Sequence, residues 1–195
     1  MVMDHYLPTD DIERYSEREV RALLAAHHID FSSWGLRGSK SIEELLVEIH
    51  SGEATLMEID GVLVRRVDGV SVDVFAEIEG EVRRLVEDRQ IFASDGTVRR
   101  RNLSTSLGEK KKAGESALPA MVRALKEELG LDVDEAHITV GEESRATAPS
   151  KAYPGLMTDR GMTRGVVVLP SELYVPEGYT ERQLTKEIYF TWHQL

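Results

Sequence analysis

The segment 114–131, GESALPAMVRALKEELGL, constrains the fold of this chain more than any other stretch of its sequence. It has the pattern of a loop, a helix and a second loop. Pro119 falls in the first turn of that helix, where a missing amide hydrogen costs little. Gly130 stands at its end, where helices commonly close with a left-handed residue. We therefore expect a helix over residues 116–129.

The residues before this segment predict antiparallel strands joined by tight turns. Acid–glycine pairs punctuate runs rich in Val, Ile and Arg, and such pairs favour hairpins because both central turn residues adopt positive φ. The pairs are Asp60-Gly61, Asp68-Gly69, Glu79-Gly80 and Asp95-Gly96. Residues 70–78 alternate between two faces, with the apolar side chains of Val70, Val72, Val74 and Ala76 on one of them. A further hairpin is expected from residues 81–92 and 97–103.

The two ends of the chain predict different structures. Two Ser-x-x-Glu sequences, beginning at Ser16 and Ser41, have the spacing of a helix capping box, so each predicts a helix. We therefore divide the chain into an N-terminal helical extension, residues 1–53, and a main domain, residues 54–195. The C-terminal third predicts a long polar loop at 142–163 and a short helix near 180–185. It also predicts strands at 137–140, 165–169 and 187–192.

The composition excludes several kinds of site and partner. The chain has 195 residues, a formal net charge of -11 and no cysteine, which rules out disulfides, thiolate zinc sites and a cysteine nucleophile. The negative charge disfavours nucleic acid, because the basic runs 99–101 and 110–112 are short and lack interleaved aromatics. No segment approaches the roughly 20 apolar residues that span a membrane, and the N-terminus does not resemble a secretory signal. A cytoplasmic protein without a membrane partner is expected.

Acidic residues cluster on the helix predicted at 116–129. Glu127 and Glu128 are adjacent, and Glu115 lies in the loop just before the helix. Arg123 is an i, i+4 neighbour of Glu127 and can orient the acids through charge-assisted hydrogen bonds. Mg²⁺ prefers oxygen ligands and takes one or two protein carboxylates together with waters and substrate phosphates. The spacing thus favours a divalent cation held against a phosphate group.

Residues 108–131 resemble the Nudix box, G-x5-E-x7-R-E-U-x-E-E-x-G-U, where U is aliphatic. The matching positions are Glu115, Arg123, Leu125, Glu127, Glu128, Gly130 and Leu131. The resemblance implies an α+β fold in which a mixed β-sheet is sandwiched between helices. It also implies that Glu127 and Glu128 bind Mg²⁺ or Mn²⁺, while Glu115 supports the site. The reaction it implies is hydrolysis of a diphosphate bond in a nucleoside-diphosphate-linked small molecule.

Two positions depart from the box, and they leave two functions open. Glu109 stands where the opening glycine is expected, although Gly108 is next to it. Ala124 replaces the glutamate that follows the arginine and that usually belongs to the metal-binding set. One alternative is an active pyrophosphohydrolase. The other is a catalytically inactive Nudix-fold module that binds a nucleotide or a protein partner.

Further residues extend the resemblance beyond the box. The sequence 152–155, Ala-Tyr-Pro-Gly, is similar to a motif of some sugar-nucleotide pyrophosphatases of the family, which makes Tyr153 and Gly155 candidates for substrate binding. Lys112 is a candidate for contact with phosphate, and Asp159, in the predicted loop, for the downstream acid. The resemblance allows a homodimer. A third function is docking of a partner through the helical extension, which an exposed apolar stripe on residues 17–27 would favour and a buried one would count against.

Overall fold

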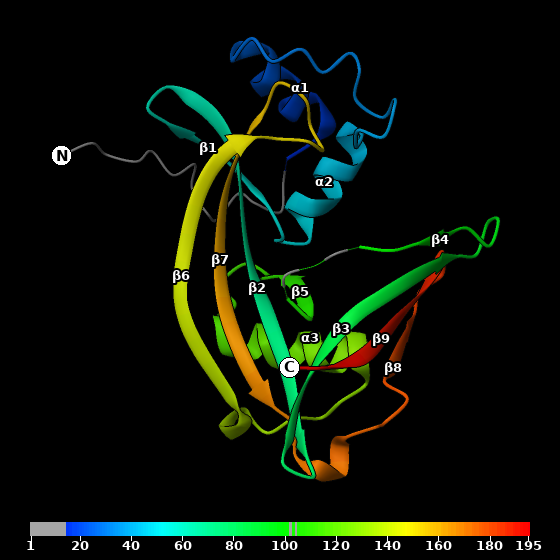
Figure 1. The fold of residues 1–195 in the computed structure, drawn as a ribbon. Helices are drawn as coiled ribbons and strands as arrows, with labels where there is room; N and C mark the ends of the chain where they lie inside the picture. The colour runs from blue at the N-terminus through cyan, green and yellow to red at the C-terminus, as the bar shows by residue number, and fades with distance from the viewer. Residues whose placement is uncertain (1–14, 102, 104) are drawn as a thin grey trace. The chain divides into compact units, whose positions relative to one another are not determined.

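The computed structural model describes residues 15–101, 103 and 105–195. These residues form three α-helices, two short 3-10 helices and nine strands (Figure 1). The helices are α1 (Glu17–Ala26), α2 (Ile42–His50) and α3 (Ala117–Leu129), and the 3-10 helices are Glu135–His137 and Ser171–Leu173. The strands are β1 (Thr55–Ile59), β2 (Val62–Ile78), β3 (Glu81–Phe92), β4 (Val98–Arg99), β5 (Leu107–Lys110), β6 (Ile138–Pro149), β7 (Met157–Val168), β8 (Tyr179–Arg182) and β9 (Lys186–Gln194). Among these helices none is long and apolar enough to cross a membrane.

The strands belong to one mixed sheet. Its order is β6-β7-β2-β3-β9-β8, with β1 and β5 also paired to β2, and β4 paired to β3. The pairs β1–β2, β2–β3, β3–β9 and β8–β9 are antiparallel, whereas the arrows of β2 and β7 point the same way in Figure 1. Helices and a large mixed sheet confirm the predicted α+β class.

The contacts within the chain define two compact units. Unit 1 comprises Met1–Asp68, Lys110–Gly114 and Ser144–Met162, and unit 2 comprises Gly69–Glu109, Glu115–Glu143 and Thr163–Leu195. β2, β5, β6 and β7 each contribute residues to both units. The boundary expected between residues 53 and 54 is a different division of the chain, and it stays a prediction.

The two N-terminal helices form as predicted and belong to unit 1. Ser16 and Ser41 each accept a hydrogen bond from the backbone N–H three residues later, and the glutamate there bonds back, which completes both capping boxes. The apolar stripe of α1, Val20 and Leu24, is fully buried in a cluster with α2. Burial of this stripe counts against the third function, in which α1 docks a partner.

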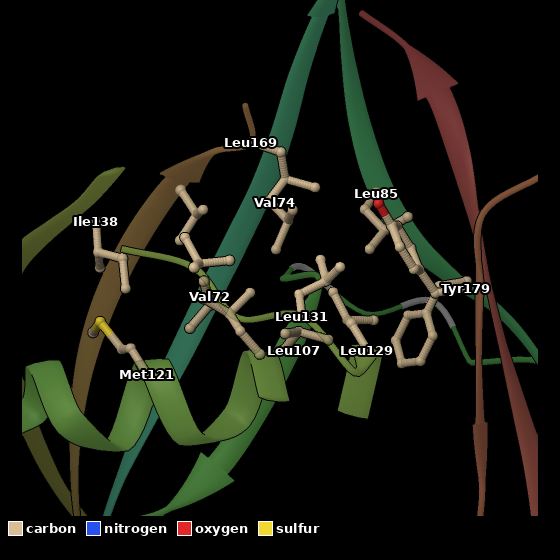
Figure 2. Packing of buried hydrophobic residues seen from close by; sticks show 14 of the residues in the cluster. Val72, Val74, Leu85, Leu107, Met121, Leu129, Leu131, Ile138, Leu169 and Tyr179 are labelled. Atoms are coloured by element: carbon tan, nitrogen blue, oxygen red, sulfur yellow. The ribbon is translucent and has the colours of Figure 1, made fainter. Parts of the chain in front are cut away.

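Unit 2 has its core between the sheet and α3. Val70, Val72 and Val74 of β2 are fully buried, which confirms the predicted alternation, and they belong to one cluster with Met121 of α3. Figure 2 shows Val72, Val74 and Met121 of this cluster. Gly165 on β7 lies so near Met121 that an added Cβ would clash with the Met121 sulfur. The absence of a side chain at this glycine therefore lets the methionine fill the core.

Of the turns predicted from acid–glycine pairs, two form the expected hairpins and one does not form. Asp60 and Gly61 have φ of 51° and 78°, and Glu79 and Gly80 have φ of 55° and 80°, so both pairs make the expected hairpin turns. The turn expected at Asp68-Gly69 is wrong, because both residues lie inside β2. β2 is seventeen residues long and pairs with β1, β3, β5 and β7, and this pairing overrides the local turn preference.

Two further predictions in the C-terminal third are wrong. The polar segment 142–163 is no loop, because most of it lies in β6 and β7. Residues 139–149 of β6 are all exposed, so no hydrophobic alternation marked this strand in the sequence. The helix expected near 180–185 is instead β8, which pairs with β9.

Candidate functional site

Helix α3 of unit 2 carries the acids of the candidate site, and it forms where the sequence predicts. Its last residue precedes Gly130, whose φ of 71° is the left-handed C-terminal conformation. Ala120, Ala124 and Leu125 are fully buried, so this face of the helix belongs to the core. A glutamate at position 124, as in the complete box, would therefore have to place its carboxylate in a buried position.

Arg123 joins three acids on the other side of α3. Its Nε and Nη2 donate to the two carboxylate oxygens of Glu115 at 3.0 and 2.9 Å, and its Nη1 donates to Glu127 at 3.1 Å. Glu109 lies 3.6 Å from the same Nη1. The hydrogen bonds with Glu115 raise the pKa of Arg123 further above its usual range, so the guanidinium stays charged. The structure thus brings Glu115, Arg123 and Glu127 together.

Glu128 lies in a different environment from Glu127. Its burial, and then the nearby charges of Glu181, Glu109 and Glu87, raise the pKa of this carboxyl to about 8. Its Oε1 atom is buried and has no hydrogen-bond partner. Burial therefore favours the protonated form of Glu128, and a positive charge nearby would favour its ionised form.

The neighbours of Glu128 come from strands distant in sequence. Glu87 of β3 is buried and forms two hydrogen bonds with Arg101, one of them 2.8 Å from Nε to Oε1. The bond to Glu87 raises the pKa of Arg101, whose charge in turn favours ionised Glu128. Glu181 comes from β8. Sequence reasoning missed these three residues, because no local spacing links them to the box.

A cavity of about 420 Å³ adjoins this group. Glu87 and Arg101 line it, together with Arg84, Asp88, Arg100 and His193, and its apolar wall is Val86 and Leu103. Arg84 and Arg100 are each held by an aspartate, Asp73 and Asp88 respectively. A cavity of this size accommodates a small ligand, and arginine is well suited to phosphate recognition.

The described residues offer a divalent cation a sparse set of ligands. Among residues 15–101, 103 and 105–195 there is no group of three or more His, Asp or Glu side chains arranged to hold a metal. Mg²⁺ nevertheless needs only one or two protein carboxylates when waters and phosphates complete its shell. The unpartnered Oε1 of Glu128, surrounded by other acids, is a donor that fits such an ion.

The predicted substrate-binding residues lie in unit 1. Tyr153 is fully buried, with its ring 5.1 Å from that of Trp34 and under the guanidinium of Arg65. Gly155 lies in the turn that follows Tyr153 and has a φ of 87°. Lys112 is exposed. In this structure the contacts of Tyr153 are packing contacts, and the roles of these three residues in binding stay predictions.

Asp159 does not lie in a loop, which corrects the prediction for this residue. It is a buried residue of β7 that accepts hydrogen bonds from Arg66 at 2.7 Å, Arg145 at 3.0 Å and Thr147 at 3.3 Å. Burial opposes its ionisation, but the two arginines lower its pKa below the ordinary value. Asp159 is therefore a charged, fully engaged side chain within unit 1.

Comparison with known proteins gives structural but no sequence-level matches. No family model matches the sequence, and no curated protein matches it. Solved structures similar to this chain include Nudix hydrolases. A MutT/nudix family protein from Enterococcus faecalis matches over 80% of this chain and 51% of its own, with 14% identity and a TM-score of 0.46. This chain thus spans about half the length of that protein.

Two other similar structures are those of an Ap4A hydrolase and of a NUDIX domain bound to ADP ribose. The Ap4A hydrolase of C. elegans matches over 65% of this chain and 79% of its own, with 12% identity and a TM-score of 0.37. The NUDIX domain of Shewanella oneidensis NrtR, in complex with ADP ribose, matches over 66% and 73%, with 10% identity and a TM-score of 0.39. At sequence identities this low, the similarity to these structures is a similarity of fold alone.

Proposed function

We propose that this chain is a metal-dependent hydrolase of a diphosphate bond in a nucleoside-diphosphate-linked small molecule. The observation that carries the proposal is Glu128, a box-helix carboxyl whose Oε1 is buried without a partner among other acids. A buried, unpaired polar atom of this kind costs free energy. A bound cation would offset that cost, because it attracts all the neighbouring carboxylates at once.

The remaining residues of α3 hold the proposed site in place. Arg123 is fixed by its two bonds to Glu115 and positions Glu127 from the same helix. Glu128 and Glu127 are the proposed ligands for Mg²⁺ or Mn²⁺. When bound, the ion would neutralise phosphate charge and lower the pKa of a coordinated water.

The lining of the cavity beside Glu87 and Arg101 supports the proposal of a nucleoside-diphosphate-linked substrate. Its arginines suit phosphate oxygens, while the carboxylates of Glu87 and Asp88 suit the hydroxyl groups of a sugar. Both kinds of group occur in a nucleoside diphosphate. A homodimer stays a proposal that the described contacts do not address.

A hydrolysis screen tests the proposal. The purified protein is incubated with Mg²⁺ or Mn²⁺ and with nucleoside diphosphate sugars, dinucleotides and nucleoside triphosphates. We expect turnover of at least one substrate, and its loss in Glu128→Gln. Glu135→Gln, which changes an exposed acid in the short 3-10 helix of unit 2, is the control and should retain activity. The proposal fails if the wild type shows neither turnover nor affinity for either metal.

A second function, a non-catalytic module that binds a nucleotide or a protein, is favoured by a different observation. Ala124 is fully buried, and the described residues contain no three-acid metal group. If this function is correct, a nucleotide or partner binds without turnover. Ala124→Glu would then destabilise the protein, because it buries a carboxylate, and would not produce activity.

A further inference from the structure

Unit 1 contains a cavity of its own, of about 420 Å³. Its lining comes from β2, β6, β7 and the turn between β6 and β7. The polar lining residues are Arg65, Ser150, Lys151, Thr158 and Arg160, and the apolar ones are three alanines and a proline within residues 146–152. All of these residues belong to unit 1, and none belongs to α3 or to the acids around Glu128.

The lining is positively charged in a strongly acidic protein. It contains three cationic side chains and no carboxylate, although the whole chain has a formal net charge of -11. Lys151 and Arg160 are exposed, and neither forms an ion pair with a carboxylate of the described residues. A local reversal of charge of this kind attracts a small anion.

Arg65 is the buried cation of this cavity. Its Nε and Nη2 donate to Glu48 Oε2, at 2.9 and 2.5 Å, so the bonds to Glu48 do not use Nη1. Glu48 also accepts from Lys40 at 2.7 Å and from Lys110 at 3.0 Å. Lys110 also pairs with Glu53, so two carboxylates face three cations and the group around Arg65 keeps a net positive charge.

Two hydroxyl groups add neutral hydrogen-bonding capacity. The Oγ1 atom of Thr158 is buried and has no hydrogen-bond partner. Ser150 Oγ accepts a hydrogen bond from the backbone N–H of Tyr153 at 3.0 Å, and this bond leaves its own hydrogen available to donate. A buried hydroxyl without a partner is costly, and a ligand oxygen in the cavity would remove that cost.

We propose that this cavity binds a phosphate-bearing organic molecule of nucleotide size. The cations and hydroxyl groups of the lining are the donors that phosphate oxygens require. The volume lies in the range of small-molecule sites and exceeds what one phosphate group needs. The small apolar residues provide a surface for the organic part. This binding goes beyond the proposed function, because it requires neither a metal ion nor hydrolysis.

Calorimetric titration in EDTA, with ADP and inorganic phosphate as probes, tests the proposal. EDTA removes divalent cations, so binding through a metal at Glu128 does not contribute, and the variants below assign the remaining ADP binding to the unit 1 cavity. We expect ADP to bind more tightly than phosphate. The double variant Lys151→Gln/Arg160→Gln should weaken ADP binding by at least about tenfold, since each loses a charged hydrogen bond.

Matched variants exclude general effects of charge and folding. Lys126→Gln/Arg182→Gln makes the same change of charge at exposed residues of unit 2 and should bind ADP as the wild type does. Thr158→Val keeps the shape of the side chain and should weaken binding, whereas Thr158→Ser should retain it. Glu128→Gln should leave this binding unchanged, even if it abolishes hydrolysis, so the two proposals can fail separately.

Three outcomes would overturn the assignment. The first is no binding of ADP by the wild type. The second is equal loss of binding in the unit 1 and unit 2 double variants, which would indicate a diffuse charge effect. The third is inorganic phosphate binding as tightly as ADP, which would show that the cavity does not recognise the organic part.

Discussion

Glu115 and Arg123 form a two-bond ion pair that ties the loop before α3 to the middle of the helix. The bonds measure 3.0 and 2.9 Å, and both side chains are largely buried. Bidentate pairs of this kind are stronger than exposed single contacts. The pair therefore fixes the geometry on which the predicted roles of Glu127 and Glu128 depend.

Breaking this pair should destabilise the protein. Glu115→Gln keeps the size of the side chain but removes the negative charge beside Arg123, and we expect a loss of about 1–3 kcal/mol in the free energy of unfolding. Urea denaturation measures it. Glu17→Gln breaks an exposed i, i+4 pair with Arg21 and should cost less than about 1 kcal/mol. Equal losses would show that the buried pair has no special role.

Divalent cations should stabilise the folded protein through Glu128. A ligand that binds only the native state raises the melting temperature by mass action. We therefore expect millimolar Mg²⁺ or Mn²⁺ to raise the melting temperature of the wild type and to have much less effect on Glu128→Gln. Differential scanning fluorimetry with and without EDTA measures the shift. Identical shifts in the two proteins would place the ion elsewhere.

Acid should destabilise the protein through Glu48. Burial opposes ionisation of this carboxyl, but hydrogen bonds from Lys40 and Lys110 and the charge of Arg65 hold its pKa at about 2, below the ordinary 4.5. A depressed pKa stabilises the folded state fully above pH 4.5, and the stabilisation is lost as the pH falls towards 2. The shift corresponds to about 3 kcal/mol.

The measurement for Glu48 compares unfolding of the wild type and Glu48→Gln between pH 7 and pH 2. The variant should be less stable at pH 7, because Arg65 loses its buried partner. The difference between the two proteins should shrink below pH 4.5. A difference that stays constant down to pH 2 would contradict the assignment, and Glu177→Gln, an exposed acid, should show no such dependence.

Gly178 should tolerate no side chain. Its φ is 83°, and an added Cβ would clash with the carbonyl oxygen of Phe190. We expect Gly178→Ala to cost more than about 3 kcal/mol, since backbone strain and a clash with the chain add together. Gly80→Ala, with a φ of 80° but nothing within 4 Å of the added atom, isolates the strain and should cost about 1 kcal/mol. Thermal unfolding of both variants decides the point.

The parts of the fold that the sequence predicted are those with local causes. The two capping boxes, the hairpin turn at Glu79-Gly80 and the end of α3 at Gly130 depend on residues a few positions apart. The strand β6 was missed because its exposed polar residues resemble a loop, and only pairing with β7 makes it a strand. Asp68-Gly69 has a turn preference that the same kind of pairing overrides.

The sequence alone determined that α3 would carry Glu127 and Glu128, with Arg123 one turn before Glu127, since helical spacing fixes which side chains are neighbours. It did not determine that the pKa of Glu128 would be raised. That follows from burial beside Glu87 of β3 and Glu181 of β8, which lie 41 and 53 residues away along the chain. Charge interactions depend on distance in space and on exclusion of water, and only the tertiary structure decides both.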